Sequence, residues 1–99
     1  MCMDAKARRA WSSIRQCVED GRYRVLTHFI QRMDERGLVW ADVLSVLDEP
    51  TDVRDGGPEQ WGRPKWIVEG ESADGLPLSV VCVLDRDERG RLTVFITAF

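Results

Sequence analysis

Residues 78–99, LSVVCVLDRDERGRLTVFITAF, carry the clearest structural pattern in the chain. The run 78–84 is apolar on both faces, as is typical of a central strand covered on two sides. Residues 91–99 alternate between apolar and polar, as a strand with one buried face does. The apolar residues that we expect to share that face are Leu92, Val94, Ile96 and Ala98. Because the intervening DRDERG is rich in turn formers, the two runs predict an antiparallel hairpin.

Two further strands precede this hairpin. Residues 65–69 alternate, with Trp66 and Val68 on one face, and the turn-rich ESADGLP connects them to residue 78. Residues 51–54 form a weaker strand, and Asp55-Gly56-Gly57-Pro58 is interpreted as a plain turn. The last three strands should therefore form an antiparallel meander.

The residues before Pro50 predict helices. Residues 4–20 carry an amphipathic stripe, and Gly21 is a suitable end for this first helix. Thr27 is expected to be the N-cap of a second helix, 28–36, with Gly37 as its stop. A third helix is expected over 40–47, and residues 23–26 are either a brief strand or an extended entry into the second helix. The residues predicted to be buried on the second and third helices are Phe29, Ile30, Met33, Val43, Leu44 and Leu47.

Helices followed by strands predict an α+β fold, with N-terminal helices packed on one face of a C-terminal antiparallel β-sheet. At 99 residues the chain is expected to form one domain over 1–99, with an N-terminal helix in 1–21 and a core in 23–99.

Composition and charge narrow the function classes. No apolar run is long enough for a membrane span, and the first residues lack the apolar core of a secretion signal, so a cytoplasmic protein without membrane contact is expected. Three scattered cysteines and one histidine are too few for a zinc site, and we expect neither a metal nor a cofactor. The net charge of −3 divides into +3 over residues 1–36 and −6 over residues 37–99.

The segment THFIQRMDERG (27–37) holds the strongest candidate site. Four-residue steps place His28, Arg32 and Arg36 on one side of a helix. An imidazole can act as a general base, and a pair of guanidiniums suits a phosphate. Such a group would fit a site that binds RNA or cleaves a phosphodiester. The alternative is a histidine that only packs, with both arginines paired to Glu35 or to acids of the sheet.

A second cationic and aromatic group consists of Arg63 and Lys65 beside Trp61 and Trp66. Such neighbours can hold phosphates and stack bases. Trp66 falls on a predicted core face, so filling the core is the better interpretation for it, whereas the role of Trp61 stays open.

The strings THFIQRMDERGL (27–38) and WADVLSVLDEP (40–50) resemble a bacterial family known as domain of unknown function 4258. The resemblance covers roughly residues 23–99. That family is similar in layout to the BrnT and RelE/MqsR-type toxins, small ribonucleases with helices before a curved antiparallel sheet. The resemblance implies a RelE/BrnT-like toxin fold, cleavage of messenger RNA, and a partner antitoxin that neutralises it.

The resemblance also implies roles for individual residues. His28 would be the base, Arg32 and Arg36 would hold the scissile phosphate, and Arg63 and Lys65 would grip the RNA backbone. The second proton-transfer group would be Tyr23, Thr97 or an arginine, and Thr97 is counted with the substrate-binding residues. RNA, an antitoxin and a second copy of the chain are the expected partners.

Two rivals remain. One is a non-catalytic protein-binding module of the same fold, whose acidic sheet docks a basic protein. The other is an unrelated small hydrolase.

Overall fold

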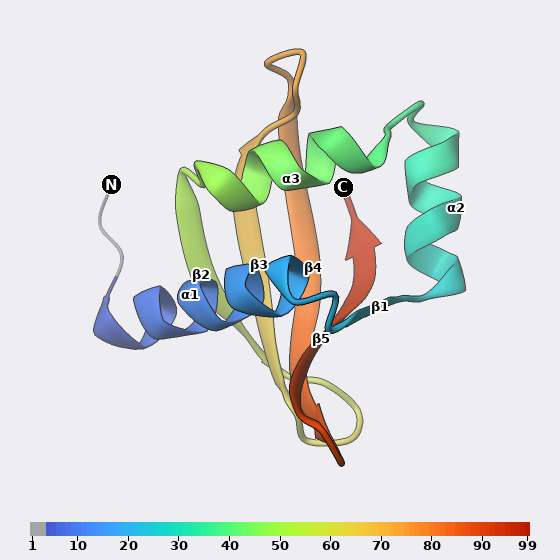
Figure 1. Cartoon of the computed structure of the whole chain (residues 1–99). Helices are drawn as coiled ribbons and strands as arrows, with labels where there is room; N and C mark the ends of the chain where they lie inside the picture. Colours follow the sequence, from blue (N-terminus) through green and yellow to red (C-terminus); the bar gives the residue numbers. More distant parts are fainter. Residues whose placement is uncertain (1–3) are drawn as a thin grey trace.

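The computed structural model describes residues 4–99, which form three helices and five strands (Figure 1). In chain order the elements are α1 (Ala5–Glu19), β1 (Tyr23–Val25), α2 (Thr27–Glu35), α3 (Trp40–Asp48), β2 (Asp52–Pro58), β3 (Pro64–Glu71), β4 (Pro77–Asp87) and β5 (Gly90–Ala98). The α+β class is confirmed. The expectation that every helix precedes every strand is wrong, because β1 lies between α1 and α2. No helix within residues 4–99 has the length and apolar character needed to cross a membrane.

The strands form one sheet in the order β1-β5-β4-β3-β2. The meander from β3 to β5 is antiparallel, as predicted, and β2 extends it by pairing antiparallel with β3. The sheet as a whole is mixed rather than antiparallel, because β1 pairs with β5 in parallel, with Tyr23 opposite Thr93. This direction follows from the end of α1, which delivers the chain to the start of β5, where the Thr93 N–H donates to the Arg22 carbonyl at 3.1 Å.

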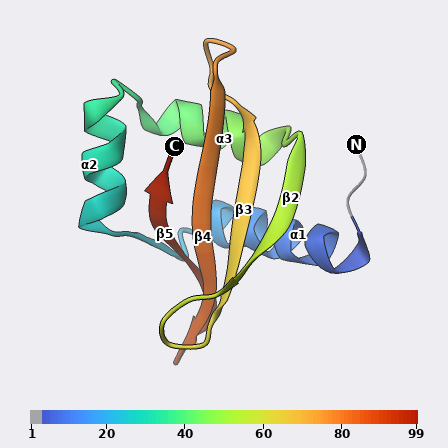
Figure 2. The same cartoon turned by 180° about the vertical axis from the view of Figure 1, so that it is seen from behind.

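The helices cover only one side of the sheet. α1 and α3 cross one face, named here the helix face, whereas Figure 2 shows the strands of the opposite face, the open face, in front of both helices. α2 stands beside the β1–β5 edge in both views. The residues that fill the main core are Ile14, Phe29, Val43, Val46, Leu47, Val68, Val80, Cys82 and Phe95.

The strand β4 is central, as the run 78–84 predicts. Both of its faces are buried, although no helix among residues 4–99 covers the open face. On that face Val83, Leu92 and Val94 form a second, smaller cluster, against which Ile96 packs. The open face thus has its own apolar centre.

A β-bulge in β5 overturns one predicted alignment. Phe95 and Thr97 face consecutive residues of β4, 82 and 81, so Ile96 is an extra residue on this strand. Beyond the bulge the alternation changes phase, and Ala98 is fully buried in the main core of the helix face. Ala98 therefore shares a face with Phe95 and not with Leu92, Val94 and Ile96.

Both predicted glycine stops are confirmed, since Gly21 (φ 70°) and Gly37 (φ 65°) follow the ends of α1 and α2 in the left-handed region. The prediction that Thr27 caps α2 is wrong. Leu26 is the N-cap, because its N–H donates to the Phe95 carbonyl at 3.1 Å and keeps it extended until the helix begins. The strand β1 thus leads into α2 without a loop.

Two residues predicted to be buried on the helices are exposed. Ile30 is 56% exposed, because Phe29 and Met33 occupy the side of α2 that faces the core. Leu44 is 36% exposed, and Val46 takes the expected inward position on α3.

The predicted turn at 55–58 is instead the end of β2. The β2–β3 register is irregular between Asp55 and Pro58, where Gly57 has φ 83°. A glycine tolerates this conformation, so the strand continues through an irregular step. The chain reverses over 59–63, where the Glu59 N–H donates to the Arg63 carbonyl at 3.0 Å.

Candidate functional site

The three candidate catalytic residues lie along α2. His28 and Arg32 are within the helix, Arg36 is its C-cap, and all three are exposed. Arg32 reaches Glu35 at 3.5 Å, which is a weak pair at a solvent-exposed position. Arg36 forms no ion pair with any residue of 4–99. If these arginines had only a structural role, both would be expected to pair with acidic residues. Of the two, only Arg32 has such a partner within residues 4–99.

The helix that carries them packs on β5 near its start, and Met33 and Leu38 pack against the main core near its end. The Phe29 ring packs on the Phe95 ring of β5 with centroids 5.5 Å apart. After Arg36, the Gly37 N–H donates to the Asp34 carbonyl at 3.1 Å, and the Leu38 N–H donates to the Met33 carbonyl at 2.8 Å. This pair of bonds is a Schellman motif, which fixes the helix end. The exposed side of α2 is thus held in a defined position.

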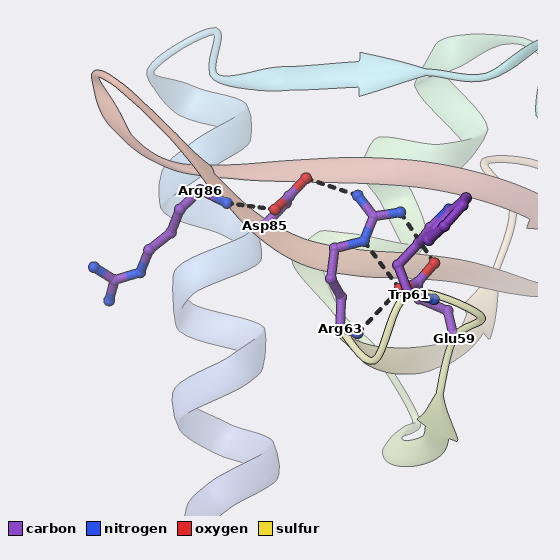
Figure 3. Close-up of polar contacts among 5 residues, drawn as sticks. All are labelled: Glu59, Trp61, Arg63, Asp85 and Arg86. Atoms are coloured by element: carbon purple, nitrogen blue, oxygen red, sulfur yellow. Dashed lines mark hydrogen bonds and ion pairs between the residues drawn. The ribbon is translucent and has the colours of Figure 1, made fainter.

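Arg63 lies at the far end of the sheet and is fully engaged (Figure 3). Its guanidinium donates to both carboxylate oxygens of Glu59 at 3.0 Å and to Asp85 Oδ2 at 2.7 Å. Glu59 also accepts the backbone N–H groups of Trp61 and Arg63, at 2.8 and 3.0 Å. This network closes the β2–β3 loop and ties it to β4, so the geometry of Arg63 is that of a loop anchor.

The network also explains the altered acidities. Hydrogen bonds from Arg63 and Trp61 favour the charged carboxylate and lower the pKa of Glu59 from 4.5 to about 2. The Arg86 N–H and the Arg63 guanidinium lower the pKa of Asp85 in the same way, and both carboxylates raise the pKa of Arg63. The loop therefore stays ionised at neutral pH.

Lys65 and Thr97 lie on the open face. Trp66 points into the main core, so its neighbour Lys65 points to the opposite, open face. The aliphatic stem of Lys65 passes over Gly56 of β2. Thr97 sits opposite Val81, beside the bulge of β5. Because β4 separates β3 from β5, the two residues are on strands about 10 Å apart.

The six candidate residues therefore do not form one cluster. Three of them, His28, Arg32 and Arg36, lie on α2 or at its C-cap. Lys65 and Thr97 lie on the open face of the sheet, and Arg63 is bound to Glu59 and Asp85 in the β2–β3 loop. Tyr23, a candidate second acid, stacks on Trp40 at 5.2 Å between centroids and takes part in the core. Within residues 4–99, no three His, Cys, Asp or Glu side chains gather as metal ligands would.

A basic groove that the sequence did not suggest lies elsewhere. It has a volume of about 650 Å³, and its cationic lining residues are Lys6, Arg9, Arg86 and Arg91. None of the six candidate residues lines it. The signal in the sequence was the excess of positive charge over residues 1–36, but Arg86 and Arg91 come from a distant hairpin whose position only the fold reveals.

Comparison with protein-family models gives a match over residues 25–99 to the family described as Domain of unknown function (DUF4258). The matched segment contains all six candidate residues, whereas α1 lies outside it. No curated protein matches the chain, and no solved structure does so either. The predicted family resemblance is confirmed, and the likeness to the BrnT and RelE/MqsR-type toxins stays a prediction.

Proposed function

We propose that this chain, which belongs to the DUF4258 family, is the toxin component of a toxin–antitoxin pair and an endoribonuclease that cleaves messenger RNA. Its reactive surface is the exposed side of α2, with His28 as the base and Arg32 and Arg36 as the phosphate-binding groups. The supporting observation is that these three side chains stand exposed on a firmly anchored helix, and that only Arg32 has an acidic partner, at 3.5 Å.

The chemistry needs few groups. The His28 imidazole takes the proton of a ribose 2′-hydroxyl, and that oxygen attacks the adjacent phosphorus. A 2′-oxygen–phosphorus bond forms while the bond to the 5′-oxygen of the next nucleotide breaks, which leaves a cyclic phosphate and a 5′-hydroxyl. Arg32 and Arg36 stabilise the negative charge on the phosphate oxygens. Because α2 is open to solvent, water supplies the proton that the leaving oxygen needs.

Induced expression of the wild type and of His28→Ala in a bacterial host tests this function. We expect growth arrest and shortened transcripts with the wild type, and normal growth with His28→Ala at an equal protein level. Arg63→Lys is the matched control. The Arg63 guanidinium is paired with Glu59 and Asp85, so this substitution should leave toxicity intact. Equal growth and intact transcripts for wild type and His28→Ala would overturn the proposal.

The rival, a protein-binding module that uses an acidic sheet, has less support. Several sheet acids are already paired within the chain: Asp52 and Glu69 with Arg54, Asp85 with Arg63, and Asp87 with Arg22. Paired carboxylates attract a basic partner less strongly than isolated ones. A protein that binds a basic partner tightly while all transcripts stay intact would establish this rival.

A further inference from the structure

The basic groove lies between α1 and the β3–β4–β5 end of the sheet. Lys6, Arg9 and Ser13 line it from α1, at helical steps of three and four residues. Arg86 and Arg91 line it from the facing strands, where they are directly opposite each other in the β4–β5 register. Two cationic walls from distant parts of the chain thus face a common space of about 650 Å³.

The positive charge of this groove is not neutralised. None of Lys6, Arg9, Arg86 and Arg91 forms an ion pair with any residue of 4–99. One acidic residue, Asp85, lines the groove, and its carboxylate already accepts a hydrogen bond from Arg63 at 2.7 Å. Figure 3 shows the Arg86 side chain pointing away from Arg63 and Asp85. In a chain of net charge −3, such a concentration of free cations marks an anion-binding surface.

A second groove continues the first. It has a volume of about 520 Å³ and shares Ser13 and Arg91 with the first, and Arg91 donates to Ser13 Oγ at 3.0 Å where the two meet. The other side chains that line the second groove are Ser12, Gln16, Cys17, Asp20, Arg22 and Arg89. The groove residues of α1 and its C-cap Asp20, 6–20, extend along about 20 Å. That length suits a ligand with several negative charges in a row.

We propose that the two grooves together bind the phosphate backbone of a single-stranded nucleic acid. Arginine forks bind phosphate in a bidentate manner, and hydroxyl and amide groups such as Ser12 and Gln16 can bond to sugars and phosphates. The two open grooves run together along α1 and can follow one flexible strand. Apolar side chains of Ala10, Pro64, Trp66 and Leu84 also line the first groove, so an acidic peptide is the rival occupant that the test distinguishes. The four cations without an acidic partner within residues 4–99 favour the strand, because a nucleic acid carries a negative charge on every phosphate.

This binding site is independent of the cleavage assigned to α2. It depends on α1, which lies outside the family match at 25–99, and no step at His28 is needed for it. The groove could hold a strand whether or not the protein cleaves it, so the two proposals fail separately.

The test measures fluorescence anisotropy of labelled ten-nucleotide oligouridylate and oligodeoxythymidylate with the full chain. The variant Lys6→Gln/Arg9→Gln removes two exposed cations of α1, and Arg15→Gln, whose partner is Asp48 on α3, is the control. We expect the double variant to weaken binding at least ten-fold and to reduce the log–log salt slope by roughly 1.4. Arg15→Gln should bind like the wild type. Circular dichroism verifies that each variant is folded, and Arg86→Gln provides a second groove variant on the sheet.

Stronger binding of oligouridylate than of oligodeoxythymidylate identifies RNA as the strand, and the reverse identifies DNA. Wild-type affinity in both groove variants would overturn the proposal. So would loss of binding in His28→Ala alone, which would place the strand on α2. Preferential binding of a polyglutamate peptide would assign the grooves to an acidic protein segment and overturn it as well.

Discussion

Glu59 shows how one carboxylate can hold a loop. Its side chain is 9% exposed and accepts from Arg63 and from two backbone N–H groups. A carboxyl with a lowered pKa stabilises the fold above its ordinary value of 4.5 and loses that contribution as the pH falls toward about 2. Melting temperatures of the wild type and Glu59→Gln should therefore differ at pH 6 and converge between pH 4.5 and about 2. A difference that stays constant across this range would contradict the role of the ionised Glu59.

At the scale of single residues, the spacing along the chain predicted which side chains share a helix, but it did not predict partners that are distant in the sequence. The four-residue steps of His28, Arg32 and Arg36 predicted their common helix correctly. Arg63 was predicted to hold phosphate because its sequence neighbours are aromatic and cationic. Its partner Asp85 is 22 residues away, and only the sheet register brings the two together.

Gly70 shows how closely α3 packs on β3. A Cβ at this position would lie 3.3 Å from the Val46 Cα and 3.5 Å from the Glu49 carbonyl oxygen, both of which are backbone atoms. Gly70→Ala should therefore push α3 away from the sheet and lower the free energy of unfolding by about 1–3 kcal/mol. Urea denaturation measures this loss. The control is Ser79→Ala, a half-buried residue on the open face of β4, which should change the free energy of unfolding by less than about 0.5 kcal/mol. Equal effects of the two substitutions would show that α3 packs less tightly on β3 than described.

At the scale of elements, periodicity located most helices and strands, but it missed features that depend on pairing. The three-residue β1 is too short for a clear pattern, and its parallel pairing with β5 comes from the path of α1. The extra residue Ile96 shifts the phase of β5, which a strict two-residue alternation does not allow. Gly56 and Gly57 suggested a turn, yet they provide an irregular step inside β2.

At the scale of the molecule, α1 is part of the core although the family match begins after it. Ile14 is fully buried against the sheet. Ile14→Ala should lower the free energy of unfolding by roughly 2–5 kcal/mol. The exposed Ser12→Ala on the same helix should change it by less than about 0.5 kcal/mol. A truncated chain that begins at Tyr23 should lose cooperative thermal unfolding, and a cooperative transition in that chain would show that residues 23–99 fold without α1.

The charge asymmetry of the chain predicted a basic half but not its shape. Residues 1–36 carry the excess of cations, and the grooves combine some of them with Arg86 and Arg91 from the acidic half. That combination requires the β4–β5 hairpin to lie beneath α1, which is a property of the whole fold. A surface that is assembled from separate segments, such as these grooves, thus depends on the fold and is not visible in the sequence of any one segment.

The rate of RNA cleavage by the purified protein is the measurement on which the function of α2 depends. A labelled messenger RNA is incubated with excess wild type, His28→Ala or Lys6→Gln/Arg9→Gln, and the single-turnover rate is followed at saturating protein. Loss of a general base should slow His28→Ala by about 100-fold or more. The groove variant should reach the wild-type rate at saturation. Cleavage by the wild type that persists unchanged in His28→Ala, or the absence of any wild-type cleavage, would contradict the assignment of catalysis to α2.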